Sequence, residues 1–158
     1  MLDTGFTRAD AENDFLRARR RQVLAALARR LHGGRGDDGR IMPLDEVVRP
    51  LGWRGERQLG LQTIPVDTII GTVNPRRDFD RRFRPTSGRV RYRWERLALA
   101  QRRGEPIPPI EVLRVGDLHF VNDGHHRVSI AAATGQREID AYVTQVLTSV
   151  LPGPAPRR

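Results

Sequence analysis

The chain has 158 residues, enough to bury one hydrophobic core, and its net charge of +9 predicts polyanionic partners such as nucleotides or nucleic acid. All 28 basic residues are arginine and no residue is cysteine, which excludes a Walker-type phosphate loop, a Schiff-base lysine, a disulfide and a cysteine nucleophile. No stretch reads as a membrane span or a signal peptide, so we expect a cytoplasmic protein of bacterial type that does not bind membranes.

The first predicted element is a helix over roughly residues 9–31. Thr7 and Asp10 have capping-box spacing before it, and two glycines, Gly33 and Gly34, end it before a polar linker over residues 35–40. An apolar stripe on this helix predicts packing on the main domain or a homodimer; a basic helix that contacts DNA or a membrane surface is the alternative. The stripe comprises Leu16, Val23, Leu24, Leu27 and Leu31.

The middle of the chain changes from helix to strand and back. A short helix is expected over residues 43–52, and a strand begins at Gln62 with Ile64, Val66, Ile69 and Ile70 as its β-branched core. An arginine-rich loop over residues 74–93 follows. A helix over residues 92–103 then ends at Gly104 before three prolines, with Trp94, Leu97, Ala98 and Gln101 on one face.

The last elements form a strand hairpin, a helix and a strand. Strands over residues 110–115 and 118–122 meet at Gly116-Asp117, a good hairpin turn. A helix starting at Gly124 and ending at Gly135 is expected to bury Val128, Ala131 and Ala132. A strand over residues 138–146 precedes a tail from Pro152 that we expect to be disordered. Together these elements predict an α+β fold, a small mixed sheet with helices, preceded by a helical N-terminal extension.

The run from Val121 to Gly135 suggests a phosphate site. The start of a helix leaves backbone N–H groups unpaired and carries the positive end of the helix dipole. Gly124 would let a phosphate approach the backbone, and Arg127 would supply a two-pronged donor. The alternative is that Asp123 is an N-cap, Gly124 a turn residue, and nothing binds.

Several motifs in order resemble the ParB/sulfiredoxin superfamily over residues 61–147. Ile64-Pro-Val-Asp-Thr-Ile followed by Asn74-Pro75-Arg76 resembles the opening strand and turn of ParB N-terminal domains. The helix over residues 94–103, followed by Pro108-Pro109-Ile110, is similar to the part of those domains where a helix is followed by a proline and then a strand. Gly124-His125-His126-Arg127 resembles their phosphate-binding box, and Ile139-Asp-Ala-Tyr-Val resembles their closing strand.

The resemblance implies a nucleotide at the box, either ATP or CTP, with or without Mg²⁺. ParB proteins bind CTP and load onto DNA, sulfiredoxins use ATP, and free serine kinases of this fold transfer phosphate. Sulfiredoxin activity is excluded because His125 stands where that family has its redox cysteine. The glutamine expected before the family's proline is replaced by Pro108, and neither the later Glu-Asn motif nor a helix-turn-helix is present, so a full chromosome-segregation role is not expected.

The phosphate-site motif and the family resemblance together give the candidate site residues. Gly124, His125, His126 and Arg127 are expected to bind the nucleotide phosphates. Asp123 and His126 are the catalytic candidates: Asp123 as a cap without chemistry, a Mg²⁺ ligand or a general base, and His126 as a donor to phosphate or satisfied by backbone. No zinc-type spacing of histidines is found, so no metal site of that kind is expected.

The loop over residues 74–93 is the candidate nucleic-acid contact. Arginines interleaved with Phe79, Phe83, Tyr92 and Trp94 suit phosphate contacts with base stacking, although the aromatic residues would equally serve as core anchors. The arginines proposed to contact nucleic acid are Arg76, Arg77, Arg81, Arg82, Arg84, Arg89, Arg91 and Arg93.

The sequence leaves three functions open. The first is a ParB-like domain that binds a nucleotide and associates with DNA. The second is a nucleotide-dependent phosphotransferase or hydrolase with Asp123 or Glu111 as base. The third is a dimerising accessory protein with a vestigial site. The domain organisation expected in each case is an extension over residues 1–60, a domain over 61–147 and a tail over 148–158.

Overall fold

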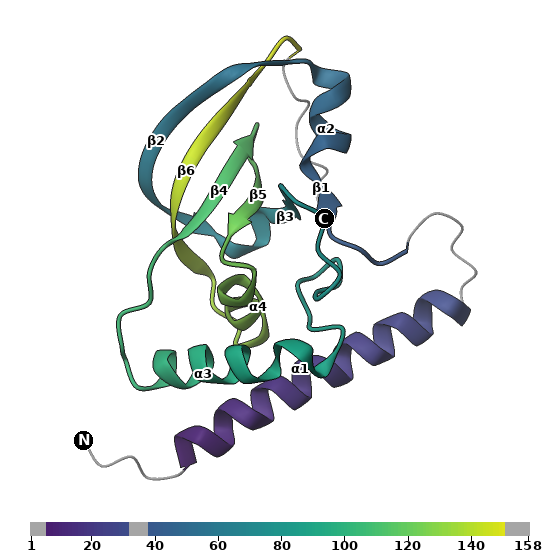
Figure 1. Ribbon diagram of the computed structural model, residues 1–158, viewed down its shortest axis with the longest axis vertical. Coiled ribbons are helices and arrows are strands. Elements are labelled where there is room, and N and C mark those ends of the chain that lie inside the picture. Colours follow the sequence, from purple (N-terminus) through teal and green to yellow (C-terminus); the bar gives the residue numbers. More distant parts are fainter. Residues whose placement is uncertain (1–5, 32–37, 151–158) are drawn as a thin grey trace.

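A computed structural model describes residues 6–31 and 38–150 of the chain (Figure 1). The predicted α+β class is confirmed: helices pack on a mixed six-stranded sheet, and a long helix comes first. Residues 35–37 of the predicted linker, Gly33 and Gly34 before it, and the whole tail from Pro152 lie outside the described residues. The helices are α1 (Phe6–Leu31), α2 (Leu44–Leu51), α3 (Arg91–Arg102) and α4 (His125–Ala133), with short 3₁₀ turns η1 (Val66–Thr68) and η2 (Gly88–Val90).

The sheet runs in the order β1-β3-β5-β4-β6-β2. Strands β4 and β5 form the predicted antiparallel hairpin, and the parallel pairs β3·β5 and β4·β6 place β5 and β4 at its centre. Edge strand β2 pairs antiparallel with β6, and the two curve away together from the rest of the sheet (Figure 1). The strands are β1 (Met42–Pro43), β2 (Trp53–Pro65), β3 (Ile69–Thr72), β4 (Ile110–Val115), β5 (Leu118–Asp123) and β6 (Glu138–Thr148).

Two hydrophobic clusters hold the fold together. The larger lies between the sheet and helices α1, α3 and α4, and Trp94 of α3 is at its centre, fully buried. The Trp94 indole N–H donates to Ser129 Oγ at 2.9 Å, which ties α3 to α4, and its ring meets Phe15 of α1 edge-on. The smaller cluster packs α2 against the sheet through Leu44, Val48 and Phe120 among others.

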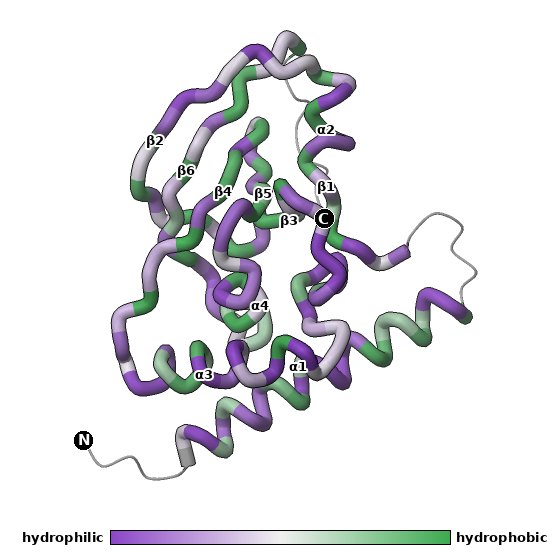
Figure 2. Tube along the Cα trace, viewed as in Figure 1, coloured by the Kyte–Doolittle hydropathy of each residue, from purple (hydrophilic) through white to green (hydrophobic). Residues whose placement is uncertain are grey.

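The predicted stripe of α1 does not pack on the main domain. The buried side chains are Ala11, Asp14, Phe15 and Ala18, whereas every member of the predicted stripe is exposed. Asp14 anchors this inner side because its carboxylate accepts from Arg102 Nε at 3.0 Å and Nη2 at 2.6 Å. The helix also begins at Phe6, so Thr7 lies inside it and cannot be its cap. Figure 2 shows that hydrophobic and hydrophilic segments alternate along α1.

The first long strand starts earlier than predicted. Strand β2 begins at Trp53, nine residues before Gln62, and pairs with β6 along its whole length. The expected single strand is also interrupted, since Val66 lies in η1 before β3 begins. The sheet therefore includes β1 and the first half of β2, which the sequence assigns to the extension over residues 1–60. On α4, Val128 and Ala131 are buried as expected, but Ala132 is exposed.

In the described part of the chain, none of the helices combines the length and apolar character needed to cross a bilayer. Helix α1 is long enough, but arginines recur along it.

Candidate functional site

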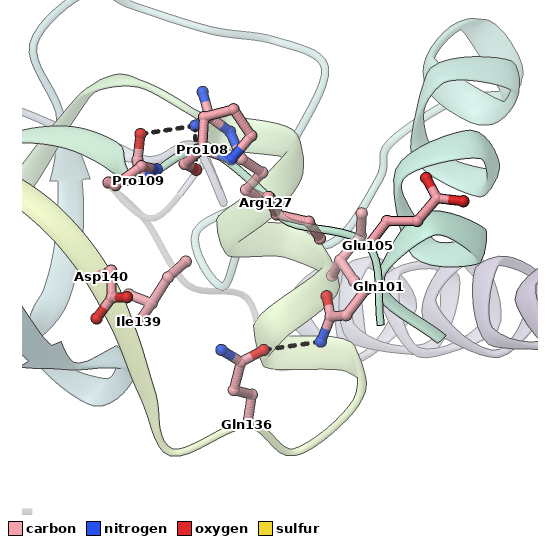
Figure 3. A pocket seen from close by; sticks show the side chains of 10 residues that line it. Gln101, Glu105, Pro108, Pro109, Arg127, Gln136, Ile139 and Asp140 are labelled. Atoms are coloured by element: carbon pink, nitrogen blue, oxygen red, sulfur yellow. Dashed lines mark hydrogen bonds between the residues drawn. The ribbon is translucent and has the colours of Figure 1, made fainter. Parts of the chain in front are cut away.

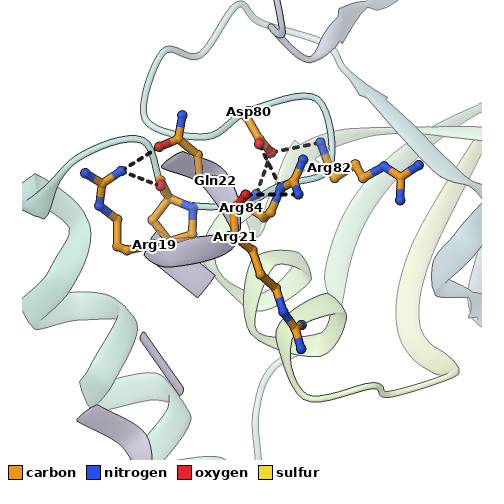
Figure 4. A network of polar contacts seen from close by, with 7 residues as sticks. Arg19, Arg21, Gln22, Asp80, Arg82 and Arg84 are labelled. Atoms are coloured by element: carbon orange, nitrogen blue, oxygen red, sulfur yellow. Dashed lines mark hydrogen bonds and ion pairs between the residues drawn. The ribbon is translucent and has the colours of Figure 1, made fainter. Parts of the chain in front are cut away.

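The loop between β3 and α3 is irregular but firmly anchored. Asp80 is buried, and its carboxylate accepts hydrogen bonds from the backbone N–H groups of Arg82 and Arg84, both at 2.9 Å, and from Arg84 Nε at 2.8 Å (Figure 4). Arg19 of α1 also donates to the carbonyl of Pro85 at 3.0 Å. Because a buried carboxylate needs partners, this set of bonds fixes the shape of the loop.

The aromatic residues of the loop are mostly core anchors. Phe79, Phe83 and Trp94 are buried, so their rings are not available to stack on bases. Phe83 has a φ of 60°, a left-handed conformation that is rare outside glycine and is held here by the surrounding packing. Tyr92, at 78% exposed, is the aromatic residue of this group that remains accessible.

His125 belongs to the core, not to a solvent-facing site. Its ring is buried beside Phe79 and Phe83, and its Nε2 lies 2.8 Å from Thr72 Oγ1. The Thr72 hydroxyl also lies 2.6 Å from the carbonyl of Asn74 and has one proton to donate there, which assigns the imidazole proton to Nε2. Burial, then the charge of Arg76, lowers the pKa of His125 to about 4, so the ring is neutral at pH 7.

Helix α4 starts with an open first turn. Gly124 is its N-cap with a φ of 111°, and no side chain of the described residues caps the helix. A Cβ at Gly124 would lie 2.5 Å from Ile110 Cγ2, so packing on β4 is what requires glycine here. Asp123 is the last residue of β5, and its carboxylate does not cap α4, although the sequence offers it as a possible N-cap. The first N–H groups of α4 therefore have no side-chain acceptor among the described residues.

Arg127 makes contacts within the protein rather than pointing into open space. Its Nη1 donates to the carbonyls of Pro108 and Pro109, both at 2.7 Å, and its Nη2 donates to Asp123 at 3.1 Å. The side chain is only 14% exposed. Three of the five N–H donors of this guanidinium are used in these bonds, so the donors left for a phosphate are Nε–H and the second N–H of Nη2.

Positive charge converges on His126, one residue further along α4. The ring of His126 lies edge-on to Phe79, with 5.2 Å between ring centroids. Burial first, then the charges of Arg93, Arg76 and, as the smallest contribution, Arg127, lower the pKa of His126 to about 4. These arginines come from three different segments: the loop, α3 and α4 itself. Asp78 opposes them, but its contact with Arg76 is long, at 3.4 Å.

Arg76 has an unused hydrogen-bond donor in this region. Its Nε is buried and has no partner among the described residues, which costs free energy unless a ligand or water supplies an acceptor. The unpaired Nε, the open first turn of α4 and the neutral ring of His126 are all donors that a phosphate could use. The donor set therefore fits the phosphate groups of a nucleotide.

The loop arginines divide into two groups. Arg84 and Arg91 have partners inside the protein: Arg84 pairs with Asp80, and Arg91 pairs with Glu95 and lies over the ring of Phe15. Arg77, Arg82, Arg89 and Arg93 are exposed, and no contact of their guanidinium groups with the described residues is seen. Arg81 is also exposed but has a partner. Arg77, Arg82, Arg89 and Arg93 are therefore the loop arginines best suited to contacts with nucleic-acid phosphates.

A cleft of about 240 Å³ lies on the other side of Arg127, between the end of α3, α4 and the start of β6 (Figure 3). Its rim is closed by a hydrogen bond of 2.9 Å from Gln101 Nε2 to Gln136 Oε1. Ile107, Ile130 and Ile139 contribute apolar surface, and Asp140 is the carboxylate at its edge. Sequence reasoning did not identify this cleft, since its residues are far apart in the chain.

Two further residues of the site were also missed. Thr72 orients His125, which is 53 residues later in the chain and beyond the reach of a local motif. Asp80 organises the loop through Arg82 and Arg84, which are close to it in sequence. In the sequence, the available signal for Asp80 is its position directly after Phe79 and directly before two arginines, because a carboxylate beside a core residue must be paired.

Comparison of the chain with protein-family models, with curated proteins and with solved structures finds no match. Within residues 6–31 and 38–150, no group of three or more histidines and carboxylates is arranged to hold a metal ion.

Proposed function

We propose that this chain is a ParB-like domain that binds the phosphate groups of a nucleotide at the start of α4 and associates with DNA through exposed arginines. The observation that carries the proposal is the buried Nε of Arg76, which has no partner among the described residues. It belongs to one of three arginines whose charges act on His126 in the first turn of α4. Guanidinium groups and unpaired helix N–H groups are the donors that proteins use for phosphate.

Nucleotide binding can be tested by thermal shift with ATP, ADP, CTP and GTP, with and without Mg²⁺. A nucleotide at 100 times its dissociation constant should stabilise the protein by roughly 2.7 kcal/mol. Arg76→Ala and Arg93→Ala should each remove the shift, because each deletes one charge from the site. Arg49→Ala is the control, since Arg49 lies on α2 and pairs with Asp45 there. A shift that survives both site variants would refute the phosphate site.

DNA association can be tested by fluorescence anisotropy with labelled duplexes at several salt concentrations. Binding through phosphates should give a linear fall of log affinity with log salt, and the double variant Arg77→Ala/Arg89→Ala should reduce that slope by about 1.8. Both side chains are exposed, so their loss should leave the fold intact. A slope unchanged in this variant would show that the loop does not contact DNA.

A nucleotide-dependent phosphotransferase or hydrolase is the second candidate. It is favoured by Asp123, whose carboxylate is 65% exposed at the edge of the same site and could accept a proton or contact Mg²⁺. This function requires nucleotide turnover that Asp123→Asn abolishes while the thermal shift with nucleotide persists. Binding without turnover favours the first function.

A further inference from the structure

The outer face of α1 is an exposed apolar surface with arginines around it. An α-helix advances by about 100° per residue. On that spacing, Leu16, Val23, Leu24, Leu27 and Leu31 fall within an arc of about 100°, opposite the inner side that carries Ala11, Phe15 and Ala18. All five are between 44% and 85% exposed. The stripe extends for about 22 Å along the helix, at 1.5 Å per residue, and a contiguous apolar patch of this kind marks an interaction surface.

Four arginines accompany this stripe. Arg20 lies within its arc, Arg17 and Arg21 lie along one side, and Arg30 lies along the other, by the same helical spacing. All four are exposed, and their guanidinium groups have no carboxylate partner in the described part of the chain. On the side of Arg17 and Arg21 the acidic residues of the helix are Asp10 and Asp14, and both pair with Arg102. Glu12 lies on the side of Arg30, about five turns before it. A partner that covers the leucines must therefore also neutralise or tolerate four cations.

A second copy of this chain, the partner that the sequence predicts for α1, fits this face poorly. An antiparallel register that brings Leu16 against the partner's Leu31 covers the leucines and places Arg20 against leucine. Residues 16–31 contain no acidic side chain, so the arginines of the two copies would gather along this interface without a counter-charge. A register that pairs Arg20 with the partner's Glu12 instead leaves Leu27 and Leu31 beyond the start of the partner's helix at Phe6. Like charges that face each other across an interface are unfavourable, so each register satisfies either the leucines or the charges.

We propose that the outer face of α1 binds an acidic amphipathic helix of another protein. Such a helix presents apolar residues at intervals of three and four to the stripe, and carboxylates on its flanks to Arg17, Arg20, Arg21 and Arg30. Helix-to-helix docking of this kind uses the exposed face of α1 without disturbing the inner side that packs on α3. Its charge pairs set the choice of partner, and its leucines supply the apolar contact.

The experiment uses two synthetic amphipathic peptides of about 18 residues, which is five helical turns. One has leucines on one face and glutamates on both flanks, and the other has glutamine in place of every glutamate. We expect the glutamate peptide to bind the full-length protein about tenfold more tightly at low salt, and this preference to shrink as salt is raised. Fluorescence anisotropy of labelled peptide measures both affinities.

Two double variants separate the contributions. Leu24→Gln/Leu27→Gln should abolish binding of both peptides, and Arg17→Gln/Arg20→Gln should remove only the preference for glutamate. Tyr92→Gln is the control, because Tyr92 is an exposed apolar side chain on α3. Circular dichroism of each variant checks that α1 is intact.

Three results would overturn the proposal. The first is equal binding of the two peptides, or no binding of either. The second is a concentration-dependent dimer in sedimentation equilibrium that Leu24→Gln/Leu27→Gln dissociates, which would assign the face to a second copy. The third is binding to vesicles of phosphatidylglycerol that the same variant abolishes, which would assign it to an anionic lipid surface.

Discussion

Residues 73–90 and the second half of α1 lie next to each other and are both rich in arginine, but they are attached to the protein in opposite ways. The loop has little regular backbone structure, yet it buries Phe79, Asp80 and Phe83. The helix has regular hydrogen bonding, yet it leaves Val23, Leu24 and Leu27 exposed. Regular secondary structure and integration into the core are therefore separate properties in this molecule, and buried side chains show where the stability lies.

The largest expected effects come from buried side chains, and the first of them is the loss of the buried carboxylate in the loop. Asp80→Ala leaves two backbone N–H groups and the guanidinium of Arg84 without their acceptor, which should cost about 3 kcal/mol of unfolding free energy. Urea denaturation measures this value. Asp45→Ala is the control, because Asp45 is 70% exposed and should change stability by less than about 0.5 kcal/mol. Equal costs at the two positions would remove the contrast between loop and surface.

The start of α4 shares the tight packing of the loop. Gly124→Ala adds a Cβ 2.5 Å from Ile110 Cγ2 at a φ of 111°, which should cost about 2–3 kcal/mol through both overlap and backbone strain. Gly104→Ala is the matched control: it has a φ of 69° but open space around the new atom, so only strain of about 1 kcal/mol is expected. Thermal denaturation of both variants compares them, and a similar loss of stability would mean that Ile110 gives way.

Acid should weaken the region around the loop and α4. The pKa values of His119, His125 and His126 are lowered from 6.5 to about 4, with burial the largest cause in each. Between pH 6.5 and 4 the unfolded chain therefore binds more protons than the folded one, and stability falls as the pH falls through this range. Urea midpoints at pH 7.5 and pH 5 measure the loss. His125→Gln should reduce the difference between the midpoints, and midpoints that do not depend on pH would contradict the burial of these rings.

The smallest effect is expected on the outer face of α1. Leu24→Ala/Leu27→Ala removes two exposed side chains, and alanine is a good helix former, so the unfolding free energy should change by less than about 0.5 kcal/mol per position. Phe15→Ala, on the inner side of the same helix, should cost about 3–4 kcal/mol. Urea denaturation of both variants tests the assignment of the two faces. A large cost at Leu24 and Leu27 would show that this face is already covered in solution.

The sequence predicts elements whose order is local and misses those whose order comes from distant partners. The hairpin of β4 and β5, the helix after Gly124 and the ends of α3 follow from turn residues and hydrophobic spacing. The first half of β2 has no such signal, since the one buried residue of the strand, Ile64, lies near its other end and pairing with β6 supplies the order. Helix α1 has apolar residues on two sides, and periodicity alone does not say which side meets α3.

In the candidate site, too, the sequence predicts what depends on local residues and misses what depends on distant contacts. The motif around Gly124 marks the start of α4 from sequence alone, and Arg76 and Arg93 are found there too, although the sequence groups them with a nucleic-acid loop. The core position of His125 depends on Thr72 and Phe79, which are about 50 residues earlier in the chain. No local pattern encodes such a contact.

The hydrogen bonds of Arg127 connect the start of α4 to another part of the molecule. One guanidinium joins the end of β5 to the carbonyls of Pro108 and Pro109, where the chain enters β4 beside the cleft. An anion that binds the Nε–H or the free Nη2–H of Arg127 therefore meets a guanidinium whose position is already fixed by the segment that leads into β4. The start of α4 and the mouth of the cleft are held together by this single side chain.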